Sequence, residues 1–311
     1  MPAGKGIRGG SAVAGLVLLA AGLAPGSAAA ASLVAEGSTT AAAACGLSLG
    51  SVTAGGDQAR RQATATVPPT VEPWWVTADV YAAPPRLSST LVYEPDIANT
   101  HVHGWVVIGD SMYRSSYDTG TDFQLEGAPR LERLGGGWGT FVAFEDAQYW
   151  APPTSFYRHN AYGLRNDGRL FRWTVDTKGV WHSSGSYAGF SSVKSMALIS
   201  KTRTYDTFLM NLRGGALYTV RIPTSSPMKP VVKVVRSGTW QGFESLIAEK
   251  CGTQGTLLVG IDKDTRSAYL YAFGHANGTA TVIQSRGKLP GTFADPTYFR
   301  WGWEPDQLNG E

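Results

Sequence analysis

The sequence predicts an all-β protein, specifically a β-propeller of five blades, or of four blades with longer loops. A short segment that ends in phenylalanine recurs at Phe141, Phe190, Phe243 and Phe293, which lie 49, 53 and 50 residues apart, and residues 89–91 form a degenerate fifth copy. A β-type unit that repeats at this period is typical of propeller blades. The 38 glycines, and the lack of any helical period in the sequence, also favour short strands and tight turns over helices.

A second motif, a turn followed by an apolar or aromatic pair, recurs within the same units. Its strongest copy is residues 166–171, which read Asn-Asp-Gly-Arg-Leu-Phe, and related turns lie at residues 109–113, 213–218 and 266–271. An Asp-Gly turn between apolar segments is a strong signal for a β-hairpin. Each repeat therefore predicts a hairpin that belongs to one blade.

The composition divides the chain into a linker, a propeller domain and a tail. Residues 32–73 are rich in Ala, Gly, Ser, Thr and Pro without a sustained apolar period, which predicts a disordered linker. The propeller domain is expected over residues 74–303, followed by a C-terminal tail over residues 304–311. Since pairing the first strand with the last removes two exposed edges, we expect residues 74–81 and 298–303 to share one closing blade.

The N-terminus has the three parts of a signal peptide. Lys5 and Arg8 form a positive region, residues 12–23 are an apolar run, and residues 29–31 are alanines that supply a cleavage site. The alternative is an uncleaved membrane anchor, but the run is shorter than the roughly 20 apolar residues that span a bilayer. We therefore expect residues 1–31 to be removed and the protein to be secreted to the extracellular space.

Charge excludes two classes of partner. Cleavage after residue 31 lowers the formal net charge from +3 to +1, because Lys5 and Arg8 leave and no acid leaves with them. A near-neutral chain lacks the basic face that nucleic-acid binding needs and the basic patch that draws a protein to a membrane surface. We expect no nucleic-acid partner, no membrane association after cleavage, and a monomer.

The chain has two cysteines, Cys45 and Cys251. In an oxidising compartment the default expectation for two cysteines is a disulfide. This bond would tether the N-terminal segment to the repeat domain. The alternative is that Cys45 carries a lipid, since small residues precede it, but it lies 14 residues beyond the expected cleavage site.

The repeats resemble those of a known group. Residues 162–171 and 212–220 each contain an apolar strand, a turn with glycine and an apolar–aromatic pair, and each is followed by Gly-Phe. In this they are similar to the tachylectin-like β-propellers of secreted bacterial proteins, over roughly residues 105–300. The resemblance implies a five-bladed fold and the binding of an amino sugar or glycan in pockets between blades.

Three aromatic residues are candidate ligand-binding residues. Trp138, Tyr187 and Trp240 each stand three positions before the phenylalanine of their repeat. An aromatic face at the mouth of a pocket could stack on a pyranose ring while its polar edge bonds hydroxyl groups. The alternative is that these rings are core residues packed between blades.

Acidic residues that follow the repeat phenylalanines are candidates for catalysis. Propeller glycosidases use two carboxylates across a pocket as acid and base or nucleophile. The alternative is that such residues are solvated ends of strands, and no Gly-x-Ser-x-Gly motif supports a hydrolase serine. The candidates are Glu145, Asp146, Glu244 and Asp295.

His101 and His103 lie two residues apart in an expected strand and so point to one face, which could begin a metal site. Neither a cysteine nor a third histidine lies near them in the sequence. We therefore expect no metal and no cofactor.

Three functions remain open. The first is a secreted, monomeric propeller that binds carbohydrate and has no enzymatic activity. The second is an extracellular scaffold for protein interactions, which an exposed apolar patch without a pocket would favour. The third is a glycan hydrolase, which two carboxyl groups about 5 to 10 Å apart in a concave site would favour.

Overall fold

The computed structural model describes residues 44–303 and 307–311, all of which belong to one unit of the chain, Ala43–Glu311. The expected signal peptide, residues 1–31, and the first part of the expected linker, residues 32–43, lie outside the described residues. The described part contains twenty strands and no helix. It therefore contains no helix long and apolar enough to cross a membrane.

Three sheets have four antiparallel strands each, in which consecutive strands are neighbours. The first consists of β8 (Phe141–Trp150), β9 (Tyr157–Arg165), β10 (Leu170–Val175) and β11 (Trp181–Tyr187). The second consists of β12 (Val193–Lys201), β13 (Tyr205–Leu212), β14 (Leu217–Pro223) and β15 (Val231–Arg236). The third consists of β16 (Ser245–Cys251), β17 (Gly255–Asp262), β18 (Ser267–Phe273) and β19 (Ile283–Lys288).

A fourth sheet has eight strands in the order β3-β2-β1-β20-β4-β5-β6-β7. One half is β3 (Thr70–Thr77), β2 (Gln58–Thr64), β1 (Gly46–Val52) and β20 (Thr297–Gly302). The other half is β4 (Leu87–Pro95), β5 (Asn99–Ile108), β6 (Ser111–Gly120) and β7 (Arg130–Gly135). The two halves meet at β20 and β4, which pair in parallel, Arg300 opposite Thr90.

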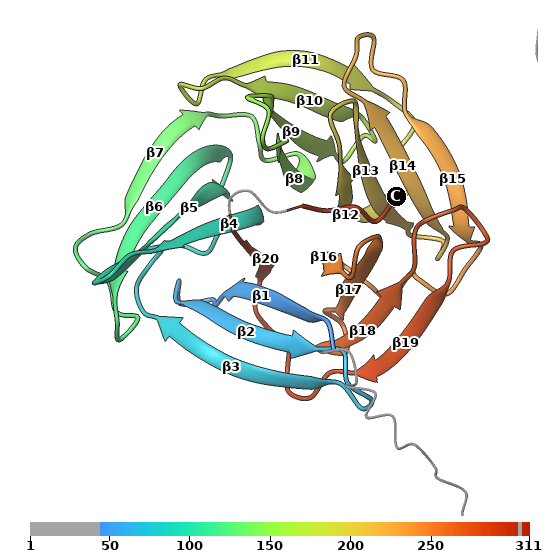
Figure 1. Ribbon diagram of the computed structural model, residues 1–311. Coiled ribbons are helices and arrows are strands. Elements are labelled where there is room, and N and C mark those ends of the chain that lie inside the picture. The colour runs from blue at the N-terminus through green and yellow to red at the C-terminus, as the bar shows by residue number, and fades with distance from the viewer. Residues whose placement is uncertain (1–43, 304–306) are drawn as a thin grey trace, which may run out of the picture. The chain divides into compact units, whose positions relative to one another are not determined.

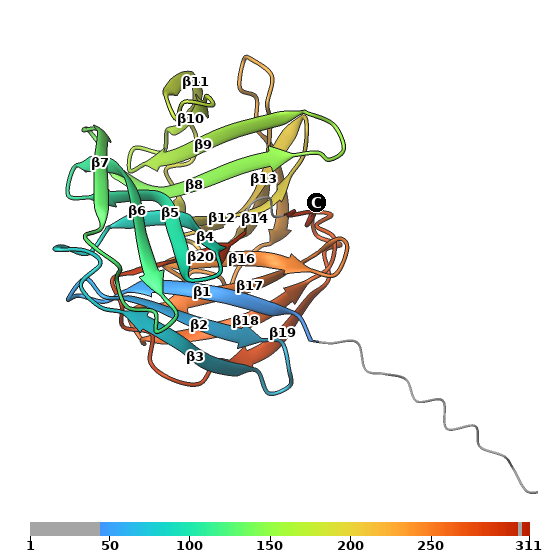
Figure 2. The ribbon, with the colours of Figure 1, turned by 60° about the vertical axis from the view of Figure 1, so that its left-hand side comes forward.

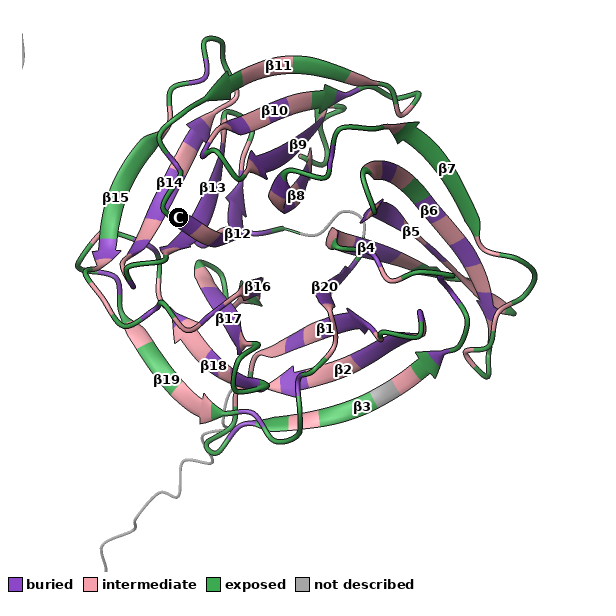
Figure 3. Cartoon of the chain, turned by 180° about the vertical axis from the view of Figure 1, so that it is seen from behind, coloured by how far each residue is buried: buried purple, intermediate pink, exposed green. Residues whose placement is uncertain are grey.

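The four-strand groups surround a common axis (Figure 1), which is the arrangement of a β-propeller. Strands β4, β8, β12, β16 and β20 lie nearest the axis, and Figure 2 shows the same groups from the side. The outermost strands β7, β15 and β19 contain at most one buried residue each (Figure 3). The inner strands β12 and β20 and the middle strands β9, β13 and β17 are mostly buried. The core therefore lies between neighbouring sheets, around the axis.

The two sequence motifs of each repeat are in contact. All four repeat phenylalanines are buried and stand at, or a few residues before, the start of an inner strand. The segment around each phenylalanine donates a backbone hydrogen bond of 2.9–3.0 Å to the hairpin turn of its unit. The donor and acceptor pairs are Trp138 to Asp110, Phe190 to Gly168, Trp240 to Gly215 and Phe293 to Arg266.

The ends of the domain share one sheet, as expected, but they are not neighbours in it. Strand β20, at the end of the domain, pairs antiparallel with β1, Leu49 opposite Arg300. Strand β3, which contains residues 74–77, pairs only with β2 and lies at the edge. The strands that close the ring are therefore β1 and β20.

The expectation of a disordered linker up to residue 73 is wrong for its described part. Residues 46–64 form β1 and β2, and β3 begins at Thr70. Leu47 and Leu49 are buried in β1, a strand that otherwise consists mainly of small residues. Small residues are required because Phe299 lies against this strand: a Cβ atom on Gly50 would lie 2.1 Å from the Phe299 ring.

The predicted disulfide between Cys45 and Cys251 is confirmed, with the two Cα atoms 5.4 Å apart. Cys45 directly precedes β1, and Cys251 is the last residue of β16 in the neighbouring sheet. Both cysteines pack against a buried apolar cluster that includes Leu47 and Leu257. The bond therefore ties the N-terminal strands to the repeats.

The described part of the expected C-terminal tail, residues 307–311, packs along the end of β12. Lys201 donates a backbone hydrogen bond to Leu308, and Gly310 donates one to Ile199. The side chain of Glu311 forms a salt bridge of 3.1 Å with Arg221. This part of the tail is therefore fixed to the domain.

Candidate functional site

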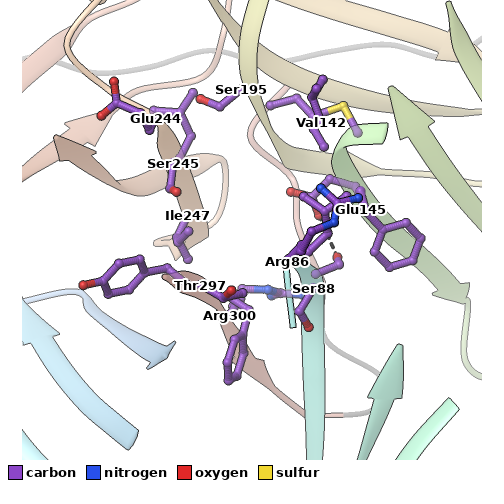
Figure 4. Close-up of a pocket in the computed structure, with 18 of the residues that line it drawn as sticks. Arg86, Ser88, Val142, Glu145, Ser195, Glu244, Ser245, Ile247, Thr297 and Arg300 are labelled. Carbon is purple, nitrogen blue, oxygen red and sulfur yellow. Dashed lines mark hydrogen bonds between the residues drawn. The ribbon is translucent and has the colours of Figure 1, made fainter. Parts of the chain in front are cut away.

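Two cavities lie at opposite ends of the innermost strands. The strand-start cavity has a volume of about 330 Å³ and is lined by the first residues of β4, β8 and β16 and by β12 and β20 (Figure 4). The strand-end cavity has a volume of about 380 Å³ and is lined by later residues of β4 and β8, with Lys201 and Trp303. Thr90 and Arg300 line both, and the guanidinium of Arg300 donates hydrogen bonds of 3.1 and 3.3 Å to the Thr90 hydroxyl. This pair marks the boundary between the cavities.

Glu145 is the distinctive titratable group of the strand-start cavity. The Ser89 hydroxyl donates a hydrogen bond of 2.8 Å to its carboxylate. Burial raises the pKa of Glu145 to about 7, although the hydrogen bond from Ser89 and the charge of Arg300 oppose the rise. A carboxyl group in a cavity that exchanges its proton near neutral pH is suited to acid–base chemistry.

Glu244 lies across the same cavity from Glu145 (Figure 4). Its carboxylate forms a salt bridge with Lys194 and accepts a hydrogen bond of 2.7 Å from the backbone N–H of Lys263. Burial lowers the pKa of the Lys263 ammonium, and the charge of Glu244 opposes that change. The cavity thus holds two carboxyl groups in different environments.

The other two predicted acids lie elsewhere. Asp146 lines the strand-end cavity, where it forms a buried salt bridge with His159. Asp295 accepts a hydrogen bond of 2.6 Å from the Ser51 hydroxyl, which fixes the loop before β20 to β1. Of the four predicted acids, only Glu145 and Glu244 line the strand-start cavity.

The strand-end cavity is bordered by three large aromatic side chains that remain exposed. The exposed fractions are 40% for Trp150, 45% for Tyr157 and 55% for Trp303. Trp150 and Tyr157 face each other across the β8–β9 ladder, and Trp303 packs on Tyr93 with ring centroids 4.5 Å apart. These rings keep free surface around one concave site.

Polar groups lie between these rings. The hydroxyl of Tyr157 donates a hydrogen bond of 3.3 Å to the side-chain oxygen of Gln148. Glu94, Lys201 and Arg300 also line the cavity. The strand-end cavity therefore combines aromatic faces with hydrogen-bonding groups of both charges.

A third cavity of about 260 Å³, the inter-sheet pocket, adjoins the strand-end cavity. It is lined by residues of β4 to β6 on one side and of β8 to β10 and the β10–β11 turn on the other. The two cavities share five lining residues: Thr90, Val92, Asp146, Gln148 and Tyr157. One ligand can therefore contact both.

Two of the three predicted stacking residues are interior. Trp138 is 7% exposed and Trp240 is 5% exposed. The ring centroids of Trp138 and Phe141 are 4.4 Å apart, and those of Trp240 and Tyr271 are 4.8 Å apart. Their loops are held inward by the backbone hydrogen bonds to the hairpin turns, so neither ring offers a free face to a ligand in this structure.

Tyr187, the third predicted residue, is 44% exposed at the end of β11. It lies 6.1 Å from the Phe190 ring and does not line any of the cavities described above. Its role as a ligand-binding residue stays a prediction.

The two histidines of β5 have separate partners. His101 hydrogen-bonds Asp118 at 2.7 Å, and His103 lies 3.8 Å from Glu94. His103 also lines the inter-sheet pocket.

Sequence reasoning missed the aromatic rim of the strand-end cavity, although a signal was present. Trp150 and Trp303 follow their repeat phenylalanines, Phe141 and Phe293, by 9 and 10 residues. Trp150 is the last residue of β8 and Trp303 directly follows β20, so both residues lie at the C-terminal ends of inner strands. A search at fixed distance after the phenylalanine, instead of before it, would have found them.

No protein-family model and no curated protein matches this sequence. Among solved structures, the chain is similar to the Aleuria aurantia lectin AAL in complex with Fucalpha1-6GlcNAc, with 12% identity, 79% of each chain covered and a TM-score of 0.42. It is also similar to the periplasmic gluconolactonase of Pseudomonas aeruginosa, with 9% identity, 81% of this chain and 97% of the other covered, and a TM-score of 0.37. A third is the GH43_1 enzyme from Xanthomonas citri complexed with xylose, with 10% identity, 68% and 78% covered, and a TM-score of 0.38. Similarity at this level assigns neither a family nor a function.

Proposed function

We propose that this protein is a secreted, five-bladed β-propeller that binds carbohydrate at the strand-end cavity without acting on it chemically. In this interpretation the eight-stranded sheet contains two blades, joined at β20 and β4, and the other three sheets are one blade each. The observation that carries the proposal is that Trp150, Tyr157 and Trp303 all keep exposed ring surface around one cavity.

The chemistry of this cavity fits a sugar. A pyranose ring has an apolar face that packs against an aromatic ring, and hydroxyl groups around its edge that need hydrogen-bond partners. Trp150 and Trp303 can supply the aromatic faces, and Gln148, Glu94 and Arg300 can supply donors and acceptors. Exposed aromatic side chains that gather at a concave site also indicate binding in general.

Two features support a secreted protein. The disulfide between Cys45 and Cys251 is of the kind that persists in an oxidising compartment. The sequence of residues 1–31 has the pattern of a cleaved signal peptide.

A variant that removes both tryptophans of the rim tests the proposal. We expect Trp150→Ala/Trp303→Ala to weaken binding of the glycan that binds best on an array by at least tenfold, because each aromatic contact is worth about 1 kcal/mol beyond the area it buries. Isothermal titration calorimetry of residues 32–311 measures the change, and circular dichroism checks that the fold is kept.

Tyr187→Ala is the matched control, since Tyr187 is as exposed as Tyr157 but lies away from the strand-end cavity. It should bind the glycan as the unmodified protein does. If Tyr187→Ala loses binding and the double variant keeps it, the site lies at Tyr187, three positions before its repeat phenylalanine, and not at the strand-end cavity. Absence of binding to every glycan on the array would refute the proposal.

A glycan hydrolase is the second candidate, supported by Glu145 and Glu244 in the strand-start cavity. An acid with a pKa near 7 opposite a salt-bridged carboxylate is the kind of asymmetric pair that glycosidases use. In that case Glu145 would protonate the leaving-group oxygen. This candidate places the function at the other end of the axis from the aromatic rim.

The variant Glu145→Gln separates catalysis from structure. If Glu145 is catalytic, the variant must lose hydrolysis of nitrophenyl glycosides. An unmodified protein that hydrolyses none of them excludes this candidate.

The same variant should also change the stability of the protein, whether or not Glu145 is catalytic. Because the folded state raises the pKa from 4.5 to about 7, the carboxyl destabilises the fold progressively from pH 4.5 to 7 and fully above it. Glu145→Gln should therefore be more stable than the unmodified protein at pH 8, by about 1–3 kcal/mol, but not at pH 4.

A further inference from the structure

We propose that the carbohydrate bound at the strand-end cavity is anionic, and that its carboxylate or sulfate group lies in the inter-sheet pocket beside Arg114 and Lys178. This inference rests on the proposed function and specifies its ligand. It follows from the charged groups that line the pocket and from the partners that each of them has.

The acidic groups of the inter-sheet pocket are engaged within the protein. Asp146 forms a buried salt bridge with His159. Asp176 accepts a hydrogen bond of 3.0 Å from His182 and bonds of 2.9 Å from the backbone N–H groups of Lys178 and Val180. These bonds, that of His182 first, lower the pKa of Asp176. Both carboxylates thus have hydrogen-bonding partners of their own within the protein.

Two basic groups of the pocket have no such partner. Arg114 and Lys178 both line it and are exposed. Within residues 44–303 and 307–311, neither side chain makes a hydrogen bond or an ion pair. Glu132 lies opposite Arg114 in the β6–β7 register, yet no ion pair joins them. The pocket therefore holds two cations that an anionic group could engage.

The turn that carries Lys178 lies close to the guanidinium of Arg114, although the two come from different sheets. Arg114 is on β6, and Lys178 is in the turn between β10 and β11. A Cβ atom added to Gly179, the residue after Lys178, would lie 4.0 Å from a terminal nitrogen of Arg114. Gly179 has a φ of 78°, a backbone conformation that favours glycine in this turn.

This pairing suits a carboxylate or sulfate on a sugar. The planar guanidinium of arginine bonds two oxygens of such a group at once, and a lysine adds a flexible point charge. Tyr157 and Gln148 line both the pocket and the strand-end cavity. A sugar ring held among the aromatic rings can therefore place its charged substituent between Arg114 and Lys178.

The test compares charged oligosaccharides with their neutral forms. A tetramer of galacturonic acid and its carboxyl-reduced form test a carboxylate, and a κ-carrageenan tetrasaccharide and its desulfated form test a sulfate. By calorimetry at 0.15 M salt, we expect at least one charged form to bind about tenfold more tightly than its neutral form. Raising the salt to 0.5 M should reduce this preference, since screening weakens exposed ionic contacts.

The variant Arg114→Ala/Lys178→Ala should lose the preference and keep the affinity for the neutral form. Arg130→Ala/Lys233→Ala is the matched control, because it removes the same two charges from exposed positions on β7 and β15 that do not line the pocket. It should retain the preference within twofold.

The outcomes separate this inference from the proposed function. Equal binding of charged and neutral forms, abolished by Trp150→Ala/Trp303→Ala, would overturn the anionic ligand and leave the carbohydrate site in place. An equal loss of preference in both double variants would also overturn it, since net charge alone would then explain the effect. If no oligosaccharide of any kind binds, both proposals fail.

Discussion

Replacing both cysteines, Cys45→Ala/Cys251→Ala, is expected to lower the free energy of unfolding by about 2–5 kcal/mol. The bond joins residues 206 positions apart, and in the chain-entropy model a cross-link that closes so long a loop restricts the unfolded chain strongly. It also fixes the strands that close the ring, because Cys45 precedes β1 and β1 pairs with β20. Loss of the bond should therefore weaken the whole domain.

Urea denaturation followed by tryptophan fluorescence measures the effect. The reduced, unmodified protein is the control, and it should unfold at the same urea concentration as the double variant. A difference below about 1 kcal/mol between the oxidised protein and the variant would show that the pairing of β1 with β20 holds the ring closed without the bond.

The repeats were predictable because their signal is local. A turn motif and a phenylalanine each recur about every 50 residues along the chain. The two motifs meet through one backbone hydrogen bond, such as that from Phe190 to Gly168. A Cβ atom on Gly168 would lie 2.2 Å from the backbone nitrogen of Ser191, and its φ is 83°. The two motifs therefore mark a contact between the hairpin turn of one four-strand group and the segment that leads into the inner strand of the next.

The first three strands could not be recognised in the same way. Their burial depends on partners far along the chain, as with Gly50 beneath Phe299, which is 249 positions away. A segment whose neighbours supply the bulky side chains has a small-residue composition, and such a composition also fits a linker. Only the three-dimensional pairing of β1 with β20 distinguishes the two.

The sequence pattern also could not predict whether an aromatic side chain points into the core or toward solvent. The spacing places Trp138 and Tyr187 at equivalent positions of their repeats, but one is buried and the other exposed. The difference arises from partners in the same sheet, because Trp173 and Phe141 surround Trp138. A repeat period gives position along the chain, and packing decides which side of the sheet the ring covers.

The burial of Trp138 leads to the second large effect. Trp138→Ala is expected to lower the free energy of unfolding by about 3–5 kcal/mol, because truncating a buried tryptophan removes apolar contacts and leaves a cavity. Its ring lies within 6.1 Å of four other aromatic rings: Phe141, Phe144, Trp173 and Trp181. Urea denaturation at 25 °C measures the loss. Trp138→Phe, which keeps an aromatic ring in the same space, should lose clearly less.

Glycan binding by the same variant distinguishes a core residue from a stacking platform. At a low temperature, where the folded state still predominates, Trp138→Ala should bind the glycan with the affinity of the unmodified protein, since Trp138 does not line the strand-end cavity. If Trp138→Ala keeps its stability but no longer binds the glycan, Trp138 contacts the ligand. In that case the loop that carries Trp138 must open for binding. The two measurements are informative together because they report on different places. Stability reports on the packing of Trp138 within the sheet, and affinity reports on the strand-end cavity at the other end of the inner strands.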